Sequence, residues 1–185
     1  MPNSIKKLSK EISLLIAAGE VIERPVSVIK ELVENSIDAN STIIIIEIEK
    51  GGFDFISVAD NGIGIASTEM KLAFDRHATS KIEDKKDIYN VKSLGFRGEA
   101  LAAINSVSEV ECMSRKRNSN TATKVSFSFG KFIKQEVLGS NYGTKIFVRN
   151  LFKNIPARYK FLNSEKSEMS KIVQFLNEIT LTHNN

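Results

Sequence analysis

From residue 107 to residue 150, apolar and polar side chains alternate with a period of two. This pattern is typical of strands that bury one face and expose the other. It predicts four strands, over Val107–Ser114, Lys124–Phe129, Phe132–Val137 and Thr144–Asn150. Gly130-Lys131 is expected to join the middle two as a hairpin. Strands of this kind pair with their neighbours along the chain, so this region is expected to form a mainly antiparallel sheet.

The earlier part of the chain has a helical period instead. A helix is expected from Pro25, a residue well suited to the first helical turn, to about Ala39. Two strands, Thr42–Glu49 and Phe53–Asp60, should follow, joined by a turn at residues 50–52.

Three further helices are expected, and together they define the fold class. They are predicted over Ser67–His77 and Glu99–Asn105, and at the end of the chain, where an apolar stripe comprises Met169, Ile172, Val173, Leu176 and Ile179. Strands and helices do not alternate regularly, which indicates an α+β protein. We expect one domain over residues 1–185, with helices on one face of a mainly antiparallel mixed sheet.

Composition and cysteine content exclude several classes of protein. The apolar run at residues 43–46 is far too short to span a bilayer, and the N-terminus lacks a signal-peptide pattern. Cys112 is the single cysteine, so no internal disulfide forms and a reducing, intracellular compartment is expected. One cysteine and two histidines supply no zinc-ligand cluster. The alternation around Cys112 predicts a buried structural thiol.

Charge is distributed unevenly. Residues 1–80 have 8 basic and 12 acidic side chains, whereas residues 81–185 have 18 basic and 10 acidic ones. This asymmetry is compatible with a carboxylate-bearing site in the first part and a polyanion partner for the second, or simply with a lysine-rich surface.

The helix from Pro25 carries three oxygen-bearing side chains on one face, Glu31, Asn35 and Asp38, opposite its apolar stripe. A solvated surface explains such a face equally well. Asn is unfavourable within a helix, however, and an amide oxygen is a ligand that hard cations accept. A carboxylate one turn away is able to activate a water molecule, so this face is a candidate magnesium and general-base site.

Asp60 ends the second predicted strand and shares its parity with two apolar residues, so its carboxylate is expected to point inward. A buried carboxylate requires a donor, and an amine on a ligand would provide one. Gly62 and Gly64 allow a close approach to a ligand or a positive φ angle. The same residues also form an ordinary turn sequence.

Two segments are suited to phosphate. Ser93–Leu101 places two glycines and Arg97 before a helix, although a simple capping loop has the same composition. Residues 77–81 add two hydroxyls, of Thr79 and Ser80, and the ammonium of Lys81. Gly139–Lys145 imitates a P-loop but has the wrong spacing and precedes a strand, and no Rossmann glycine motif follows the first strand.

Taken together and in order, these blocks resemble the MutL family of DNA mismatch-repair ATPases. The resemblance covers about residues 5–181, and it rests on the segments Ile16–Pro25, Lys30–Ala39, Asp60–Gly64, Arg76–Lys81, Ser93–Leu101, Gly143–Thr144 and Asn154–Arg158. The segment from Gly95 to Leu101 is the most specific of them. Ile155 departs from the Thr or Val that the family more often has.

The resemblance implies the two-layer α/β sandwich of the GHKL superfamily (the Bergerat ATP-binding fold), with ATP and Mg²⁺ held between helices and sheet. It implies Glu31 as general base, Asn35 as magnesium ligand with Asp38 nearby, and Asp60 as acceptor for the adenine amine. It also implies contacts to the nucleotide from Gly62, Gly64, Thr79, Ser80, Lys81, Leu94, Gly95, Phe96, Arg97, Gly98, Glu99, Ala100, Leu101 and Thr144.

The resemblance further implies slow ATP hydrolysis that gates self-association of N-terminal domains, sequence-independent DNA binding and recruitment of a MutS-type mismatch recogniser. DNA binding by this chain alone is expected to be weak, through Arg115, Lys116 and Arg117 and through Lys153, Arg158 and Lys160. The family has further transducer and C-terminal dimerisation domains, so the chain is expected to be an N-terminal part of a longer protein, cytoplasmic if bacterial and nuclear if eukaryotic. Two alternatives stay open: a nucleotide-gated binding module without turnover, and another GHKL ATPase of chaperone or topoisomerase type.

Overall fold

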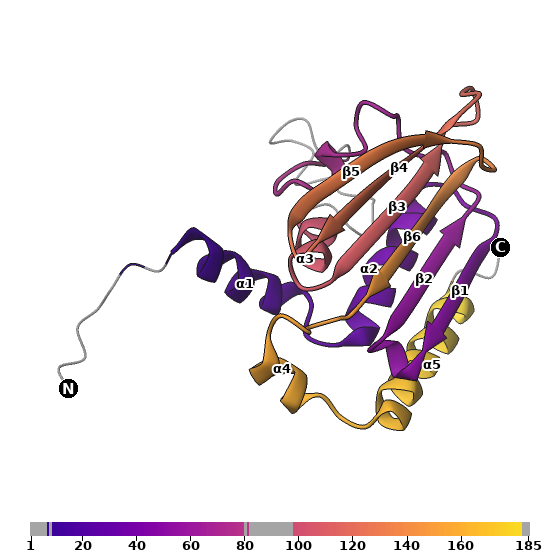
Figure 1. Cartoon of the computed structure of the whole chain (residues 1–185). Helices are drawn as coiled ribbons and strands as arrows, with labels where there is room; N and C mark the ends of the chain where they lie inside the picture. Colours follow the sequence, from indigo (N-terminus) through magenta and orange to yellow (C-terminus); the bar gives the residue numbers. More distant parts are fainter. Residues whose placement is uncertain (1–6, 8, 80, 82–97, 183–185) are drawn as a thin grey trace, which may run out of the picture.

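The structure, a computed structural model, describes residue 7, residues 9–79, residue 81 and residues 98–182. Six strands form one sheet in the order β1-β2-β6-β3-β4-β5 (Figure 1). Their bounds are Ile44–Glu49 (β1), Phe55–Asp60 (β2), Glu109–Arg115 (β3), Ala122–Ser128 (β4), Lys131–Leu138 (β5) and Gly143–Arg149 (β6). Every pairing among them is antiparallel, which confirms the expected antiparallel sheet; the parallel pairing of a mixed sheet does not occur among these strands.

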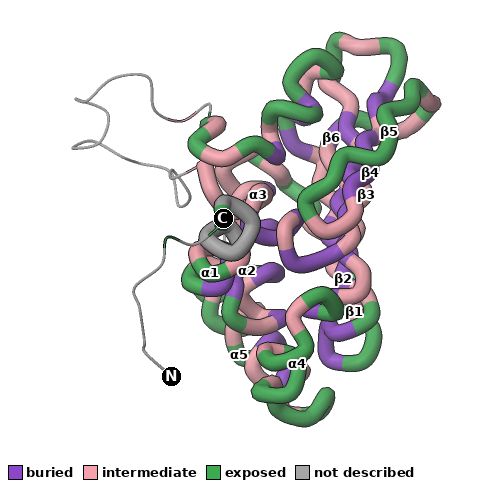
Figure 2. Tube along the Cα trace, turned by 60° about the vertical axis from the view of Figure 1, so that its left-hand side comes forward, coloured by how far each residue is buried: buried purple, intermediate pink, exposed green. Residues whose placement is uncertain are grey.

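The helices form a second layer. Figure 2 shows α1, α2, α3 and α5 on one side of the strands, as predicted for a two-layer sandwich. The α-helices span Lys10–Val21 (α1), Pro25–Asp38 (α2), Ala100–Ser106 (α3), Pro156–Phe161 (α4) and Glu165–Thr182 (α5), and short 3-10 turns span Lys50–Gly52 (η1) and Leu72–Phe74 (η2). The turn predicted at residues 50–52 is therefore η1, which joins β1 to β2. No helix in the described part of the chain is both long and apolar enough to cross a membrane.

Alternation along the strands and the apolar stripe of α2 build the core between the layers. Ile56 and Val58 of β2 point toward the helices and are almost completely buried. Ile29 and Leu32 of α2 are buried in the same cluster. Burying a side chain of this size contributes about 1.5–3 kcal/mol, so the seam between α2 and β2 is a large part of what holds the two layers together. Cys112 on β3 is fully buried in this core, as the alternation predicts.

The helix predicted over residues 67–77 is wrong. The segment consists of turns and the single 3-10 turn η2, in which Phe74 N–H bonds to Lys71 O at 3.2 Å. Met70 and Phe74 are buried but Leu72 is exposed, so the apolar side chains support one turn only. His77 takes a φ of 62° and donates its backbone N–H to Gly98 O at 3.0 Å. This long-range contact replaces the bond that a continuing helix would make.

The closing helix is confirmed as α5, but the predicted apolar stripe is only partly right. Ile172 is fully buried, whereas Val173 is 48% exposed. The position that the pattern misses is Glu168, whose side chain is completely buried one turn before Ile172. A periodicity argument counts Glu168 as polar and therefore leaves it out of the buried face. The buried face of α5 includes Glu168 and Ile172 but not Val173.

Candidate functional site

The inward-facing end of β2 carries the most constrained carboxylate of the predicted site. Asp60 Oδ1 accepts hydrogen bonds from Gly62 N at 2.8 Å and Thr144 N at 3.3 Å. Asp60 Oδ2 accepts one from Ser36 Oγ on α2, at 3.1 Å. The side chain is half-buried, so both oxygens are fixed while part of the carboxylate stays accessible. An acceptor held by three donors is rigid, which is what recognition of a donor on a ligand needs.

The loop after Asp60 is pinned to its surroundings by backbone packing. Asn61 Oδ1 accepts hydrogen bonds from Thr42 N and Ile43 N, at 2.9 and 3.0 Å. Gly64 has a φ of 70°, and a Cβ atom there would lie 2.3 Å from Arg115 O. Gly64 is therefore required both by its backbone conformation and by the close approach of the end of β3, before any ligand is considered.

Thr144 lies opposite Asp60 in the register of β2 and β6. Its Oγ1 is 2.9 Å from Ser114 Oγ, which is also bonded to Gly143 O at 3.0 Å and receives Ile65 N–H at 2.8 Å. The structure thus brings Thr144, Asp60 and the glycine loop together at one end of the sheet. Ser114 was missed by the sequence analysis; the signal was its inward parity with Cys112 on β3.

Ser36 was missed as well. It is buried on α2, facing the sheet, and its Oγ also donates to Leu32 O at 3.0 Å. A polar residue next to the apolar stripe of an amphipathic helix was the available signal. The residue matters because it joins the helix layer to Asp60 directly.

The oxygen-bearing face of α2 is half-buried along its length, which argues against a fully solvated surface. Lys81 Nζ donates to Asn35 Oδ1 at 3.1 Å and forms an ion pair with Asp38. Burial raises the pKa of the neighbouring Glu34 carboxyl, and the negative charge of Asp38 adds to this, while Lys30 and Lys81 oppose it. Glu31 lies on the same face, half-buried.

The segment before Lys81 lies against the start of α3. His77 N bonds to Gly98 O, and His77 Nδ1 is 3.6 Å from Glu99 Oε1. Lys81 N donates to Thr79 Oγ1 at 3.1 Å. Through these contacts Gly98 and Glu99, which lead into α3 with Ala100 and Leu101 in its first turn, are connected to the segment that contains Lys81. The predicted contacts Ser80, Leu94, Gly95, Phe96 and Arg97 lie outside the described residues.

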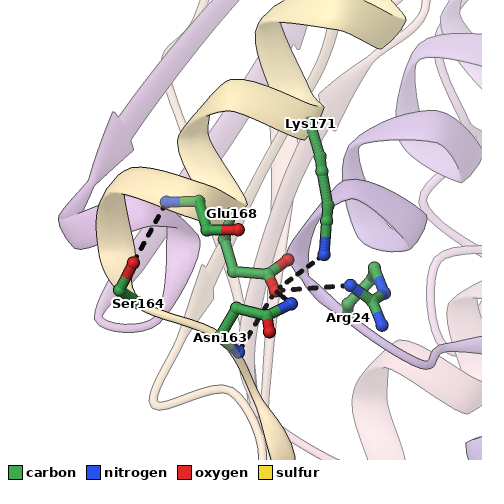
Figure 3. Close-up of polar contacts among 6 residues, drawn as sticks. Arg24, Asn163, Ser164, Glu168 and Lys171 are labelled. Atoms are coloured by element: carbon green, nitrogen blue, oxygen red, sulfur yellow. Dashed lines mark hydrogen bonds and ion pairs between the residues drawn. The ribbon is translucent and has the colours of Figure 1, made fainter.

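A buried ion cluster anchors the N-terminal end of α2 (Figure 3). Glu168 Oε1 accepts hydrogen bonds from Arg24 Nη1 at 3.4 Å, from Asn163 Nδ2 at 3.0 Å and from Lys171 Nζ at 3.4 Å. Arg24 immediately precedes α2, so the cluster connects α5 to the start of the helix that carries Glu31 and Asn35. Sequence reasoning missed this cluster because Arg24 lies 144 residues from Glu168 in the chain.

A surface hollow lies away from these residues. A cavity of about 360 Å³ is lined by aromatic, apolar and charged residues, among them Phe53, Leu151, Lys153, Tyr159 and Lys160. It sits at the start of β2 and the end of β6, whereas Asp60 and Thr144 lie at the opposite end of those strands. The hydrogen-bond geometry, not the cavity, therefore identifies the candidate site.

The cations predicted to contact DNA do not form one surface. The loop that follows Arg115 and the helix α4 lie at opposite ends of the sheet (Figure 1). Arg117 lies over the Tyr142 ring at 4.9 Å. Arg158 donates to Ile22 O at 3.1 Å and lies over Phe152, so it has a structural role in holding α1. Lys153 and Lys160 remain exposed.

The side-chain oxygens of Asn35 and Asp38 on α2 are suitable ligands for a hard cation. An amide oxygen and a carboxylate are ligands that Mg²⁺ accepts, and both of them already bind a cation, the Lys81 ammonium. No group of three or more His, Cys, Asp or Glu side chains that is able to hold a metal occurs among the described residues. A metal here would therefore need further oxygen ligands from a bound molecule or from water.

Comparison with known proteins agrees with this fold. Residues 23–149 match the family described as histidine kinase-, DNA gyrase B-, and HSP90-like ATPase, and the chain belongs to this family. Within it, the chain is similar to the DNA mismatch repair protein MutL of Halothermothrix orenii, with 51% identity over 97% of this chain and 28% of that protein. MutL of Lactobacillus delbrueckii subsp. bulgaricus is 52% identical over 97% of this chain and 27% of its own length. The chain thus spans little more than a quarter of these relatives.

Solved structures give the same class of protein. The Aquifex aeolicus MutL ATPase domain complexed with ADP superimposes with a TM-score of 0.68 and 35% identity, over 88% of this chain and 57% of that one. The N-terminal domain of a DNA repair protein gives a TM-score of 0.73 and 29% identity, over 88% of this chain and 46% of that one. The domain has the GHKL fold that the resemblance implied, and it is similar to MutL ATPase domains.

Proposed function

We propose that this chain binds Mg²⁺-ATP between α2 and the helix-facing side of the sheet and hydrolyses it in the service of DNA mismatch repair. The observation that carries the proposal is Asp60, a half-buried carboxylate held rigidly by Ser36, Gly62 and Thr144. Its remaining acceptor capacity matches the exocyclic amine of adenine. The ADP complex of the Aquifex relative supports a nucleotide as the ligand of this fold.

Similarity to a MutL ATPase domain complexed with ADP supports the nucleotide contacts proposed here. Gly62, Gly64 and Thr144 lie beside Asp60 and would line the adenine. Thr79, Ser80, Lys81 and the segment from Leu94 to Leu101 would surround the phosphates. Asn35, with Asp38 beside it, would hold Mg²⁺, which supplies neutralisation of charge on the phosphate oxygens when it is bound.

Glu31 is the proposed general base. Its carboxylate takes a proton from a water molecule, the water oxygen forms a bond to the γ-phosphorus, and the bond from the γ-phosphorus to the β–γ bridging oxygen breaks. ADP and inorganic phosphate leave. Glu31 lies on the same face of α2 as Asn35, one turn away, which places the proposed base next to the proposed metal ligand.

The wider activity is also proposed. DNA, a MutS-type mismatch recogniser and a second N-terminal domain are the partners implied by similarity to MutL. Because the basic loop and α4 are at opposite ends of the sheet, we expect this chain to bind DNA weakly and without sequence preference.

Phosphate release from ATP by the purified chain tests the proposed reaction. Mg²⁺-dependent release that is lost in Glu31→Ala supports it. ATP binding without release by the wild-type chain would instead favour the nucleotide-gated module without turnover. Absence of both binding and release would contradict the proposal.

A further inference from the structure

Lys81 contacts the two side-chain oxygens on α2, of Asn35 and Asp38, that a divalent cation would need as ligands. Its ammonium donates to Asn35 Oδ1 at 3.1 Å and pairs with Asp38 Oδ2. The pair is well sheltered, since the Lys81 side chain is 23% exposed and that of Asp38 is 11% exposed. Shielding from water strengthens such a pair relative to a surface ion pair.

The surroundings make this cation difficult to remove without replacement. Glu34, whose side chain is 13% exposed, adds a second carboxylate one turn before Asp38 on α2. Withdrawing the ammonium would remove a sheltered cation from direct contact with Asn35 and Asp38, which is costly. A free metal ion must therefore displace Lys81 before it gains its own ligands.

Without a nucleotide, the residues that the structure describes supply too few ligands for a free metal ion. Mg²⁺ prefers six oxygen ligands, and the described residues supply no cluster of three acidic, histidine or cysteine ligands at this place. A bound nucleotide would favour replacement of the Lys81 ammonium by a metal ion in two ways. Its phosphates give the metal additional oxygen ligands, and they give the ammonium another anion to pair with. Lysine has a long, flexible stem and a compact charge, which suits a side chain that changes partners.

We infer that Lys81 is a built-in cation that excludes free divalent metal from Asn35 and Asp38 and admits it only together with a nucleotide. This inference rests on the proposed function for the identity of the nucleotide, but the exclusion of free metal depends only on the contacts of Lys81. Lys81 would thus discriminate between a free metal ion and a metal ion bound to the phosphates of a nucleotide.

The test measures Mn²⁺ binding in the absence of nucleotide, by the loss of the free-ion electron paramagnetic resonance signal. We expect weak binding by the wild-type chain and an affinity about tenfold higher or more in Lys81→Met, because a competing positive charge in direct contact has been removed. Lys124→Met is the matched control. Lys124 is similarly sheltered, at 25% exposed, and pairs with Glu111 and Glu136 on the sheet, so its loss changes the net charge equally.

The added Mn²⁺ affinity should also disappear in the double variant Lys81→Met/Asp38→Asn. An affinity in Lys81→Met no higher than in Lys124→Met, or a gain that survives Asp38→Asn, would overturn the inference. Thermal melts report whether each variant is folded, and Lys81→Gln replaces Lys81→Met if the methionine variant is not.

A separate titration of the wild-type chain with ADP distinguishes this failure from failure of the proposed function. If ADP binds and Lys81→Met gains no Mn²⁺ affinity, only the inference about Lys81 is wrong. If no nucleotide binds, the proposed function fails, while the Mn²⁺ comparison still decides whether Lys81 excludes free metal.

Discussion

Ser36 Oγ on α2 lies 3.1 Å from Asp60 Oδ2 on β2, and this hydrogen bond joins the two layers of the domain at the candidate site. Ser36 is buried and Asp60 is half-buried, so the bond is sheltered from competing water. Because Glu31 and Asn35 belong to the same helix as Ser36, the bond also fixes how far the proposed catalytic face stands from the proposed adenine acceptor.

Replacing Glu31 by Ala is expected to slow ATP hydrolysis by about 10²–10⁴-fold, the usual loss when a general base is removed. Affinity for Mg²⁺-ATP should change only a few-fold, since the carboxylate acts on water and not on the nucleotide. Turnover is measured by phosphate release and affinity by calorimetry. Glu34→Ala is the control on the same helix, and normal turnover in Glu31→Ala would move the base to another residue, with Glu34 the first to examine.

Cys112 gives the domain a defined dependence of stability on pH. Burial, with a smaller effect of the Asp60 charge, raises the pKa of the thiol from 9.0 to about 12. The unfolded chain therefore loses the thiol proton at lower pH than the folded chain. The contribution to stability is complete below pH 9 and is lost as pH rises from 9 toward 12, at about 1.4 kcal/mol per pH unit.

Urea unfolding of wild type and Cys112→Val between pH 8 and pH 11 measures this effect. The difference between the two proteins isolates the thiol, because lysines and tyrosines titrate in both. We expect the free energy of unfolding of wild type to fall more steeply above pH 9. Parallel curves would show that Cys112 is not held in an apolar environment.

The Arg24–Glu168 ion pair is expected to contribute more to the free energy of unfolding than an exposed ion pair with a shorter N···O distance. A double-mutant cycle of Arg24→Met and Glu168→Gln should give a coupling energy of about 1–3 kcal/mol, because Glu168 is completely buried. The control is Lys50–Asp54, where the atoms are 2.7 Å apart but the side chains are 60% and 48% exposed. A larger coupling energy for Lys50–Asp54, measured by urea unfolding, would contradict this assignment of the buried cluster.

DNA binding should depend on salt through the loop after β3. If Arg115, Lys116 and Arg117 neutralise up to three phosphates, the logarithm of affinity should fall with that of salt concentration at a slope of about −1 to −3. Changing all three to Ser should flatten the slope, whereas Lys153→Ser/Lys160→Ser at the other end of the sheet should affect it less. Fluorescence anisotropy with duplex DNA checks this, and an unchanged slope in the triple variant would exclude the loop.

Much of the fold follows from local patterns in the sequence. Pro25 and the stripe of α2 define that helix, and alternation defines the strands, because both signals come from residues close together in the chain. The inward direction of Asp60 followed from the same parity argument. The helix at residues 67–77 failed because the bond from His77 N to Gly98 O lies beyond the reach of local propensity.

Polar contacts between residues far apart in the chain likewise could not be predicted from the sequence. The burial of Glu168 has no local signal, because its partner Arg24 lies 144 residues away in the chain. Arg158 was counted as a cation for DNA, but it donates to a carbonyl of the segment after α1. The pairing of Lys81 with Asn35 and Asp38 joins residues more than 40 positions apart, which no periodicity describes.

Calorimetric titration of ADP and Mg²⁺-ATP into wild type and Asp60→Asn tests the central claim most directly. The Asn oxygen is able to keep the bonds from Gly62 N and Thr144 N, so the fold should be retained and a thermal melt should show it. The amide N–H, however, would face the adenine amine, and two opposed donors leave an unsatisfied polar group that costs about 1–3 kcal/mol. We expect ADP and Mg²⁺-ATP to bind Asp60→Asn about 5- to 150-fold more weakly than they bind wild type. Equal affinity of the two folded proteins would contradict the assignment of Asp60 and with it the proposed nucleotide site.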